Sequence, residues 1–231
     1  PPPPPPPPPP LFFLHAKPAI RDAQEARGLG YVYKRKLNDY ANNPISVTSI
    51  VQDSSDWVWV GTLDAGVLRL RNDDGSYIGT VSGISSSHVS SMAHDENTEI
   101  LVIGHHQSGI SLVNTSTMTL VDVLTTSDGL DSDLITQVAT RYGFAYIATP
   151  DAGVMRINLY DMAIIGSWQS LGADNLDATP VAVDDDIIYL GLSDFGLLII
   201  DRLTGDIIDL WTQDDGTLPV SYTHLRAHET P

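Results

Sequence analysis

The stretch V-T-S-I-V-Q-D…W-V-W-V-G-T…G-V-L-R-L, at residues 47–53, 57–62 and 66–70, contains three short segments rich in Val, Ile, Leu and Trp. Asp, Ser and Gly bound these segments and favour turns, so the stretch predicts three consecutive β-strands. The same pattern returns three more times along the chain. These four copies decide the fold, because self-similarity at a fixed period is the signature of a repeat architecture.

The period is about 43 residues in every copy. The second strand of each copy ends at a small residue, and the spacings between these residues are 43, 44 and 43: Gly61, Gly104, Ala148 and Gly191. Five residues later a glycine opens the third strand, with the same spacings: Gly66, Gly109, Gly153 and Gly196. We expect this glycine to need a positive φ or a close approach of backbone.

Each copy also has a strand before and after this pair. The leading strands are expected at 47–53, 89–95, 135–141 and 178–184, and the trailing strands at 76–81, 119–124, 163–168 and 206–211. Four strands in about 43 residues is the period of a propeller blade. The sequence therefore predicts an all-β chain, a β-propeller of four repeats that form four-stranded antiparallel blades.

We expect this propeller to be incomplete. The segment D-G-T-L-P at 215–219 resembles the start of another loop between blades. Propellers usually close with four to eight blades, and an arc of four would expose apolar blade faces at both ends. The partners of the chain would then include the remaining blades of a parent protein.

The two ends of the chain differ from the repeats. Residues 1–10 are all proline, and V-S-Y-T-H-L-R-A-H-E-T at 220–230 resembles the in-frame translation of a sequencing-library adapter. Residues 26–36 resemble the reverse strand of that adapter, and residues 14–22 resemble its primer segment. We therefore expect three parts, namely a non-native disordered segment at 1–36, the propeller fragment at 37–219, and a disordered adapter-like tail at 220–231.

The charge of the repeats excludes some functions. The whole chain has 12 Lys and Arg against 29 Asp and Glu, a net charge of −17, but residues 37–219 keep 5 basic and 26 acidic residues, a net of −21. Such a surface repels phosphate backbones, so we expect no nucleic-acid binding. No apolar run approaches the ~20 residues of a membrane helix, so this fragment should not insert into a bilayer. The absence of cysteine excludes disulfides and thiolate chemistry.

Strand alternation places two sets of loops on one face of a propeller, the usual binding face. The loops between blades are expected at 82–88, 125–134 and 170–177, and those between second and third strands at 62–65, 105–108, 149–152 and 192–195. We take the candidate binding-face residues from the second set: Asp64, His105, His106, Gln107, Asp151 and Asp194. The three aspartates stand two residues before the repeated glycine, where we expect them to satisfy turn backbone.

A metal site is a weaker candidate. The Asp-rich loop with Asp128, Asp131 and Asp133 offers carboxylate oxygens for calcium, but it lacks the D-x-D-x-D-G pattern. His105 and His106 are adjacent, so their side chains should point in different directions, and the sequence favours solvated loop histidines over metal ligands. No cofactor is evident.

No catalytic motif stands out. The chain has no nucleophile elbow, phosphate-binding glycine loop or cysteine nucleophile. We therefore expect a module that is not an enzyme, although a catalytic site in other blades stays open.

The repeats resemble the sensor-region propellers of hybrid two-component regulators. The resemblance rests on the opening stretch and on T-S-D-G-L-D-S-D-L at 126–134, where that family usually has proline in place of Asp131. The resemblance implies a binding or sensor module of a larger, extracytoplasmic protein (periplasmic, cell-surface or secreted). Its acidic loop face would bind a protein, small molecule or glycan.

Two alternatives remain. The last unit, with Gly196 and Trp211, resembles quinoprotein-type propeller repeats, and Gly153 and Trp168 keep the same spacing. This weaker resemblance implies an enzyme propeller, either a quinoprotein-like oxidoreductase or a polysaccharide-active lyase or hydrolase. A structural repeat array of a surface protein is the other alternative.

Overall fold

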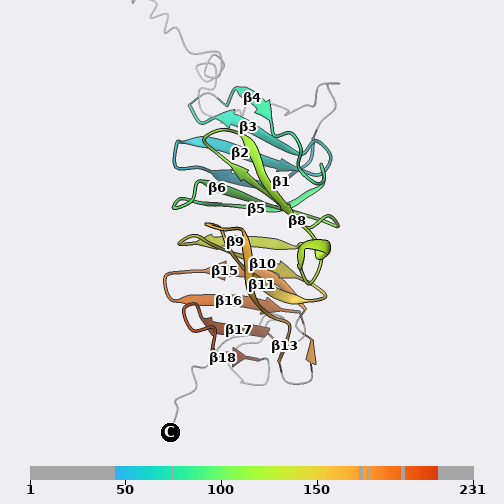
Figure 1. Ribbon diagram of the computed structural model, residues 1–231, viewed down its shortest axis with the longest axis vertical. Coiled ribbons are helices and arrows are strands. Elements are labelled where there is room, and N and C mark those ends of the chain that lie inside the picture. Colours follow the sequence, from blue (N-terminus) through green and yellow to red (C-terminus); the bar gives the residue numbers. More distant parts are fainter. Residues whose placement is uncertain (1–44, 74, 172–173, 176, 194–195, 213–231) are drawn as a thin grey trace, which may run out of the picture. The chain divides into compact units, whose positions relative to one another are not determined.

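The computed structural model describes residues 45–73, 75–171, 174–175, 177–193 and 196–212. The predicted end segments 1–36 and 220–231 lie outside these residues. The described part contains four sheets of four antiparallel strands, and the strands of each sheet are neighbours in sequence order (Figure 1). This confirms the predicted all-β fold of four-stranded blades.

The strands have the following bounds. The first blade contains β1 (Val47–Gln52), β2 (Trp57–Thr62), β3 (Val67–Arg71) and β4 (Tyr77–Thr80), and the second contains β5 (Val89–Asp95), β6 (Ile100–His105), β7 (Ile110–Asn114) and β8 (Thr119–Leu124). The third contains β9 (Gln137–Arg141), β10 (Phe144–Thr149), β11 (Gly153–Asn158) and β12 (Ala163–Trp168). The fourth contains β15 (Ala178–Val183), β16 (Ile187–Leu192), β17 (Gly196–Asp201) and β18 (Ile207–Trp211).

Two short elements lie in the loops between blades. A 3-10 turn, η1 (Thr126–Asp128), precedes β9, and a small hairpin of β13 (Ser170–Leu171) and β14 (Asp174–Asn175) precedes β15. The sequence pattern predicted neither. The strand β9 also begins two residues later than predicted, because the N–H of Ile135 donates to the carbonyl of His105 in the preceding blade. Ile135 therefore joins the second blade, while the N–H of Thr136 donates to the carbonyl of Ala148 in its own blade.

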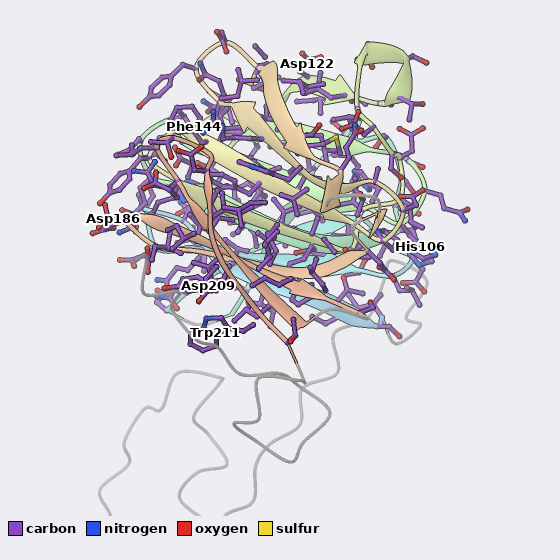
Figure 2. The ribbon with its side chains drawn as sticks, turned by 90° about the horizontal axis from the view of Figure 1, so that it is seen from below. His106, Asp122, Phe144, Asp186, Asp209 and Trp211 are labelled. Carbon is purple, nitrogen blue, oxygen red and sulfur yellow. The ribbon has the colours of Figure 1, made fainter. Side chains whose placement is uncertain are left out.

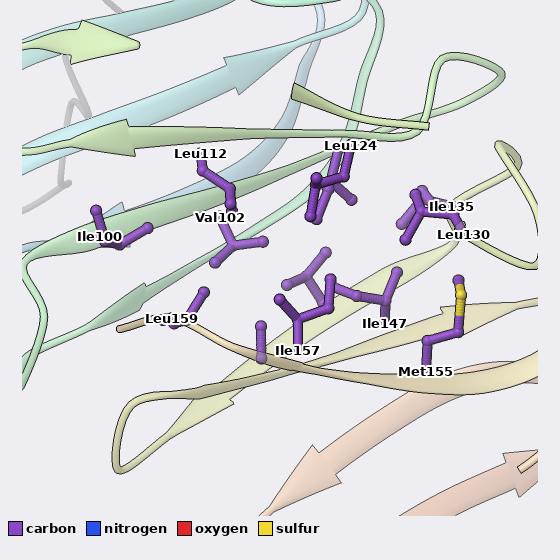
Figure 3. Packing of buried hydrophobic residues seen from close by; sticks show 13 residues of the cluster. Ile100, Val102, Leu112, Leu124, Leu130, Ile135, Ile147, Met155, Ile157 and Leu159 are labelled. Atoms are coloured by element: carbon purple, nitrogen blue, oxygen red, sulfur yellow. The ribbon is translucent and has the colours of Figure 1, made fainter. Parts of the chain in front are cut away.

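Successive blades pack through their leading strands. β1 contacts β5, β5 contacts β9, and β9 contacts β15. One buried apolar cluster lies between each pair of neighbouring blades, and the cluster between the second and third blades contains Val102, Ile147 and Ile157 with no exposed surface (Figure 3). Because each sheet is apolar on both faces, burial against its neighbours stabilises every blade.

A repeated hydrogen bond joins the leading strands. Ser49 Oγ accepts the N–H of Met92 at 3.1 Å, and Ser91 Oγ accepts the N–H of Val138 at 3.2 Å. In the third interface a longer side chain acts in the same way, since Gln137 Oε1 accepts the N–H of Val181 at 3.3 Å. These bonds therefore fix the position of each leading strand along the leading strand of the blade before it.

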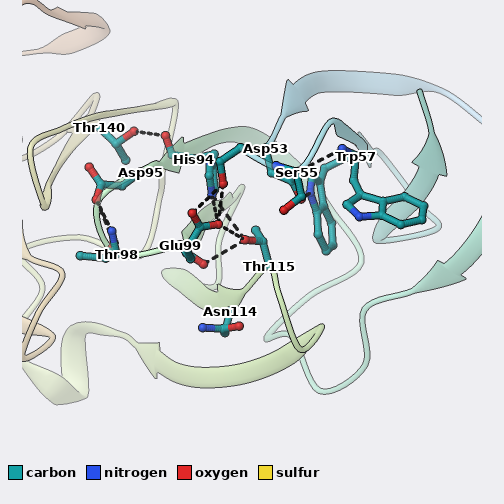
Figure 4. A network of polar contacts seen from close by, with 12 residues as sticks. Asp53, Ser55, Trp57, His94, Asp95, Thr98, Glu99, Asn114, Thr115 and Thr140 are labelled. Atoms are coloured by element: carbon teal, nitrogen blue, oxygen red, sulfur yellow. Dashed lines mark hydrogen bonds and ion pairs between the residues drawn. The ribbon is translucent and has the colours of Figure 1, made fainter. Parts of the chain in front are cut away.

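An aspartate at the end of the leading strand organises the adjacent turn in the first two blades (Figure 4). Asp53 is buried and accepts the N–H groups of Ser55 and Trp57, each at 2.9 Å, and the indole N–H of Trp59 at 2.8 Å. Asp95 accepts the N–H of Gly143 in the third blade at 2.9 Å. These carboxylates are structural, because they satisfy backbone donors in and between blades.

Candidate binding face

The loops between blades and the turns between second and third strands are hydrogen-bonded to each other. The N–H of Gly66 donates to the carbonyl of Ser87, and the N–H of Gly109 donates to the carbonyl of Asp133, both at 3.0 Å. The two sets of loops therefore lie on one face of the described blades. We call this the loop face and define it by residues 62–66, 82–88, 105–109, 125–134, 149–153 and 177.

The repeated glycine is required for this arrangement. Gly66, Gly109, Gly153 and Gly196 have φ values of 71, 65, 73 and 108°. A Cβ added at Gly109 would collide with the carbonyl of Leu124, and one at Gly153 with the carbonyl of Trp168. The predicted positive φ is confirmed at all four glycines, and the close approach of backbone is found at Gly109 and Gly153.

Threonine, rather than aspartate, satisfies the backbone of these turns. Thr62 Oγ1 accepts the N–H of Ala65 at 2.9 Å and donates to the carbonyl of Gly66 at 2.8 Å. Thr149 Oγ1 makes the equivalent bonds, at 3.1 Å with Ala152 and 2.9 Å with Gly153. The signal was present in the sequence, since threonine directly follows the small residue of the first and third repeats.

The aspartates of the same turns do not accept these backbone hydrogen bonds. Asp64 and Asp151 are exposed, and within the described residues no turn N–H donates to either carboxylate. The prediction that they satisfy turn backbone is therefore wrong, and their carboxylates face solvent. Gln107 is also exposed, while Asp194 lies outside the described residues.

His105 differs most from its prediction. It occupies the position of Thr62 and Thr149 but has no exposed surface, so it is not a solvated loop residue. Its Nε2 lies 2.9 Å from Ser111 Oγ, which also accepts the N–H of Ser85 at 3.0 Å. Burial lowers the pKa of His105 to about 4, and the backbone of His88, which raises that pKa, only partly offsets the effect of burial. The buried ring of His105 thus packs against the loop between the first and second blades, which explains the histidine at this position.

His106 points the other way. It is exposed, and its ring stacks on that of His88 with centroids 5.5 Å apart. Figure 2 shows His106 on the opposite side of the blades from Phe144, the first residue of β10, and Asp186, which lies in the turn before β16. The two adjacent histidines thus have different environments, and they do not converge on one point.

The Asp-rich loop is closed by its own hydrogen bonds. Asp128 Oδ2 accepts the N–H of Thr125 at 3.0 Å, and Asp133 Oδ1 accepts the N–H of Thr126 at 2.7 Å. Asp131 is exposed. Across the residues that the structure describes, no three His, Asp or Glu side chains come together in a way that would hold a metal ion.

The loop face carries charge of one sign. Among its described residues it has six carboxylates and no Lys or Arg: Asp64, Asp128, Asp131, Asp133, Asp151 and Asp177. The five arginines of residues 45–212 lie within strands or at the other end of the blades: Arg69, Arg71, Arg141, Arg156 and Arg202. Arg141 pairs with Asp185 of the fourth blade there. Arg156 likewise donates to the carbonyl of Arg202 in the fourth blade. The described arginines thus lie away from the loop face, whose charged side chains are all acidic.

A shallow pocket lies away from this face. It has a volume of about 260 Å³ beside the turns at the other end of the first blade, where Trp57, Arg71 and Asp73 line it. It contains none of the candidate binding-face residues. In the described part of the chain, no helix has the length and apolar character to cross a membrane.

Comparisons with known proteins agree with the resemblance found in the sequence. Residues 39–64 match the family model described as "Two component regulator propeller". None of the curated proteins matches the chain.

Three solved structures share the fold. The extracellular domain of the putative hybrid two component system BT3049 from B. thetaiotaomicron is 16% identical with a TM-score of 0.56, over 70% of this chain and 24% of that one. The RRP9 WD40 repeats are also 16% identical with a TM-score of 0.62, over 79% of this chain and 55% of that one. The computationally designed Ika8 protein is 20% identical with a TM-score of 0.60, over 75% of this chain and 50% of that one.

The chain thus spans between a quarter and just over half of these structures. It consists of β-propeller repeats that resemble the sensor-region propellers of hybrid two-component regulators.

Proposed function

We propose that this chain is part of a non-enzymatic binding or sensor module whose loop face binds a positively charged partner. The observation that carries the proposal is the charge of that face, with six carboxylates and no Lys or Arg among its described residues. The match to the two-component regulator propeller model at residues 39–64 supports a sensor role.

Three of these carboxylates can contact a positively charged partner because they are exposed on the loop face. Asp64, Asp131 and Asp151 are exposed, and the turn backbone beside two of them is already satisfied by Thr62 and Thr149. Clustered charge of one sign steers an oppositely charged partner and disfavours a like-charged one. The partner class is therefore a basic protein segment or a cationic small molecule.

The site of action follows by analogy. The matched BT3049 structure is the extracellular domain of a putative hybrid two component system. We propose the same side of the membrane for this chain, as part of a longer protein that supplies the signalling output.

Charge-neutral variants test the proposal. The triple variant Asp64→Asn, Asp131→Asn, Asp151→Asn removes three charges from the loop face. Its matched control, Asp73→Asn, Glu96→Asn, Asp206→Asn, removes three exposed charges from the turns at the other end of the strands. The probe is a fluorescent decalysine peptide, and binding is followed by anisotropy at low and high salt.

The two triple variants have the same net charge, so they separate a local site from general attraction. We expect the loop-face variant to bind the peptide roughly tenfold more weakly, from about 0.5 kcal/mol for each exposed pair, and to lose much of its salt dependence. The control should stay within about twofold of the unmodified chain. Equal weakening in both variants would show that the loop face is not a binding site.

A further inference from the structure

Arg156 belongs to a cluster of three arginines toward the end of the blades opposite the loop face. The cluster contains Arg141 of β9, Arg156 of β11 and Arg202, which directly follows β17. Nη1 of Arg156 donates to the carbonyl of Arg202 at 3.1 Å. Arg141 pairs with Asp185, and Arg202 also lies near the carboxylates of Asp185 and Asp201. Arg156 differs, because it belongs to none of the ion pairs that join the described residues.

The first blade shows the group that Arg156 lacks. Arg69 of β3 lies opposite Trp59 of β2 in the paired strands. Arg156 of β11 lies opposite Tyr146 of β10 in the same way. In the first blade the buried carboxylate of Asp53 lies 3.9 Å from Nη2 of Arg69 and accepts the indole N–H of Trp59 at 2.8 Å. One carboxylate thus serves both the cation and the aromatic donor there.

The third blade has an arginine at the position of that aspartate. The other three blades have an aspartate at the end of the leading strand, namely Asp53, Asp95 and Asp184, whereas the third has Arg141. The side chain of Arg141 reaches the fourth blade, where it pairs with Asp185. The third blade therefore keeps the arginine and the aromatic donor of the first blade, but it has a cation in place of their carboxylate.

The donors at this place are left without acceptors. Among the described residues, the buried hydroxyl of Tyr146 and the buried Nε of Arg156 find no acceptor. Burial raises the pKa of Tyr146, and the guanidinium groups of Arg202 and Arg156 partly offset this, so both groups lie near the hydroxyl. Guanidinium groups only donate hydrogen bonds, and buried polar groups are normally paired, so an acceptor from outside the chain is expected. Arg156 is partly exposed, so such an acceptor can reach its side chain from solvent.

We propose that Arg156 and Tyr146 bind a small-molecule carboxylate, which takes the place that the carboxylate of Asp53 occupies in the first blade. Its two oxygens accept one hydrogen bond from the guanidinium group and one from the hydroxyl. Hydrogen bonds between a guanidinium group and a carboxylate are charge-assisted and stronger than neutral ones. The ring centroids of Phe144 and Trp168 each lie 5.8 Å from Cζ of Arg156, so an apolar part of the molecule would lie beside aromatic rings.

This site differs from the loop face in place and in charge. Figure 2 shows Phe144, which lies beside the site, on the opposite side of the blades from His106 of the loop face. The charged side chains of the loop face are acidic, whereas Arg156 is a cation, so the two sites take ligands of opposite charge. The carboxylate site therefore does not depend on the function proposed for the loop face.

Acetate binding to the full chain tests the proposal. Titration with sodium acetate at pH 7.5 and constant ionic strength, followed by saturation transfer to the methyl protons, should show saturable binding in the millimolar range. Arg156→Gln should weaken this binding at least about tenfold, because it removes the charged donor. Tyr146→Phe, which removes only the hydroxyl, should weaken it about fivefold. The matched control Arg71→Gln removes an exposed arginine of the first blade and should stay within about twofold.

Arg141→Asp gives a reciprocal test. It restores the aspartate of the other three blades, so a carboxylate of the chain would occupy the site, and acetate should no longer bind to a chain that stays folded by circular dichroism. Arg141→Gln removes the same positive charge without supplying a carboxylate, and it should keep acetate binding within about threefold. Equal acetate binding by these two variants would contradict the equivalence with Asp53.

Two other results would overturn the proposal. A folded, unmodified chain that shows no saturable acetate binding would indicate that water satisfies the two donors. Equal weakening by Arg156→Gln and Arg71→Gln would show that acetate responds to the general charge of the chain and not to a site in the third blade.

Discussion

Replacing His105 by threonine should remove a defined part of the pH dependence of stability. Thr62 and Thr149 occupy the same position in the first and third blades, so the fold accepts threonine there. The histidine is buried in the second blade, and its pKa is lowered from 6.5 to about 4 because burial disfavours the charged ring. The folded state therefore keeps His105 neutral well below the pH at which the unfolded chain protonates it.

The sign and size of the effect follow from that difference. Between pH 6.5 and about 4 the unfolded state binds the proton and the folded state does not, so the free energy of unfolding falls as the pH falls through this window. At 1.36 kcal/mol for each pKa unit, the loss from this residue is about 2 kcal/mol between pH 7.5 and pH 5. Below the folded pKa the loss stops growing at roughly 3 kcal/mol.

Urea unfolding followed by tryptophan fluorescence at pH 7.5, 6 and 5 measures the effect. Other titrating groups contribute equally to both proteins, so the difference between the unmodified chain and His105→Thr isolates His105. We expect the stability advantage of the unmodified chain to shrink by about 2 kcal/mol from pH 7.5 to pH 5. His106→Thr, at the exposed neighbour, should leave the slope unchanged. Parallel stability curves for the unmodified chain and His105→Thr would refute the reasoning.

Three further substitutions, two of them with a matched control, test the turns. Gly153→Ala should cost about 3 kcal/mol in thermal unfolding, since its Cβ meets a backbone carbonyl at a positive φ, whereas Gly75→Ala, at a similar φ with open space, should cost about 1 kcal/mol. Equal losses would show that crowding is not the cause. Asp53→Ala should cost about 3 kcal/mol because three donors lose their acceptor, and Asp64→Ala should stay within about 0.5 kcal/mol in the same melts. Thr149→Val should lower the free energy of unfolding by about 1 kcal/mol in urea, and an unchanged midpoint would contradict its place in the turn.

The local pattern was enough to predict the blades and their glycines. Strand alternation, turn residues and a period of about 43 residues are properties of neighbouring residues, so they can be found without knowing what packs on what. The glycine before the third strand was predictable for the same reason, because a positive φ is a local demand on the backbone. Gly66 and Gly109 have the expected conformation, with φ of 71 and 65°.

The candidate site was predicted less well. His105 lies in a sequence context typical of a loop. In the structure it is buried beneath the loop between the first two blades, and its ring is hydrogen-bonded to Ser111 of the next strand. The turn aspartates were assigned a capping role that threonine performs. The burial of His105 depends on the loop at 82–88, which lies far from it in sequence, so the local pattern does not reveal it. The threonine contacts are local, since Thr62 Oγ1 accepts the N–H of Ala65 three residues on, and they could have been predicted.

The sequence by itself determined that the chain is built from four similar β-blades in order, because each blade is a local unit of fixed length. Only the tertiary structure decided which equivalent residues are covered. Ile50 and Met92 occupy the same position in the pattern, but their exposed fractions are 66% and 5%. The physical reason is that burial belongs to the interface between blades, and a residue gains it only when a neighbouring blade is present to exclude water.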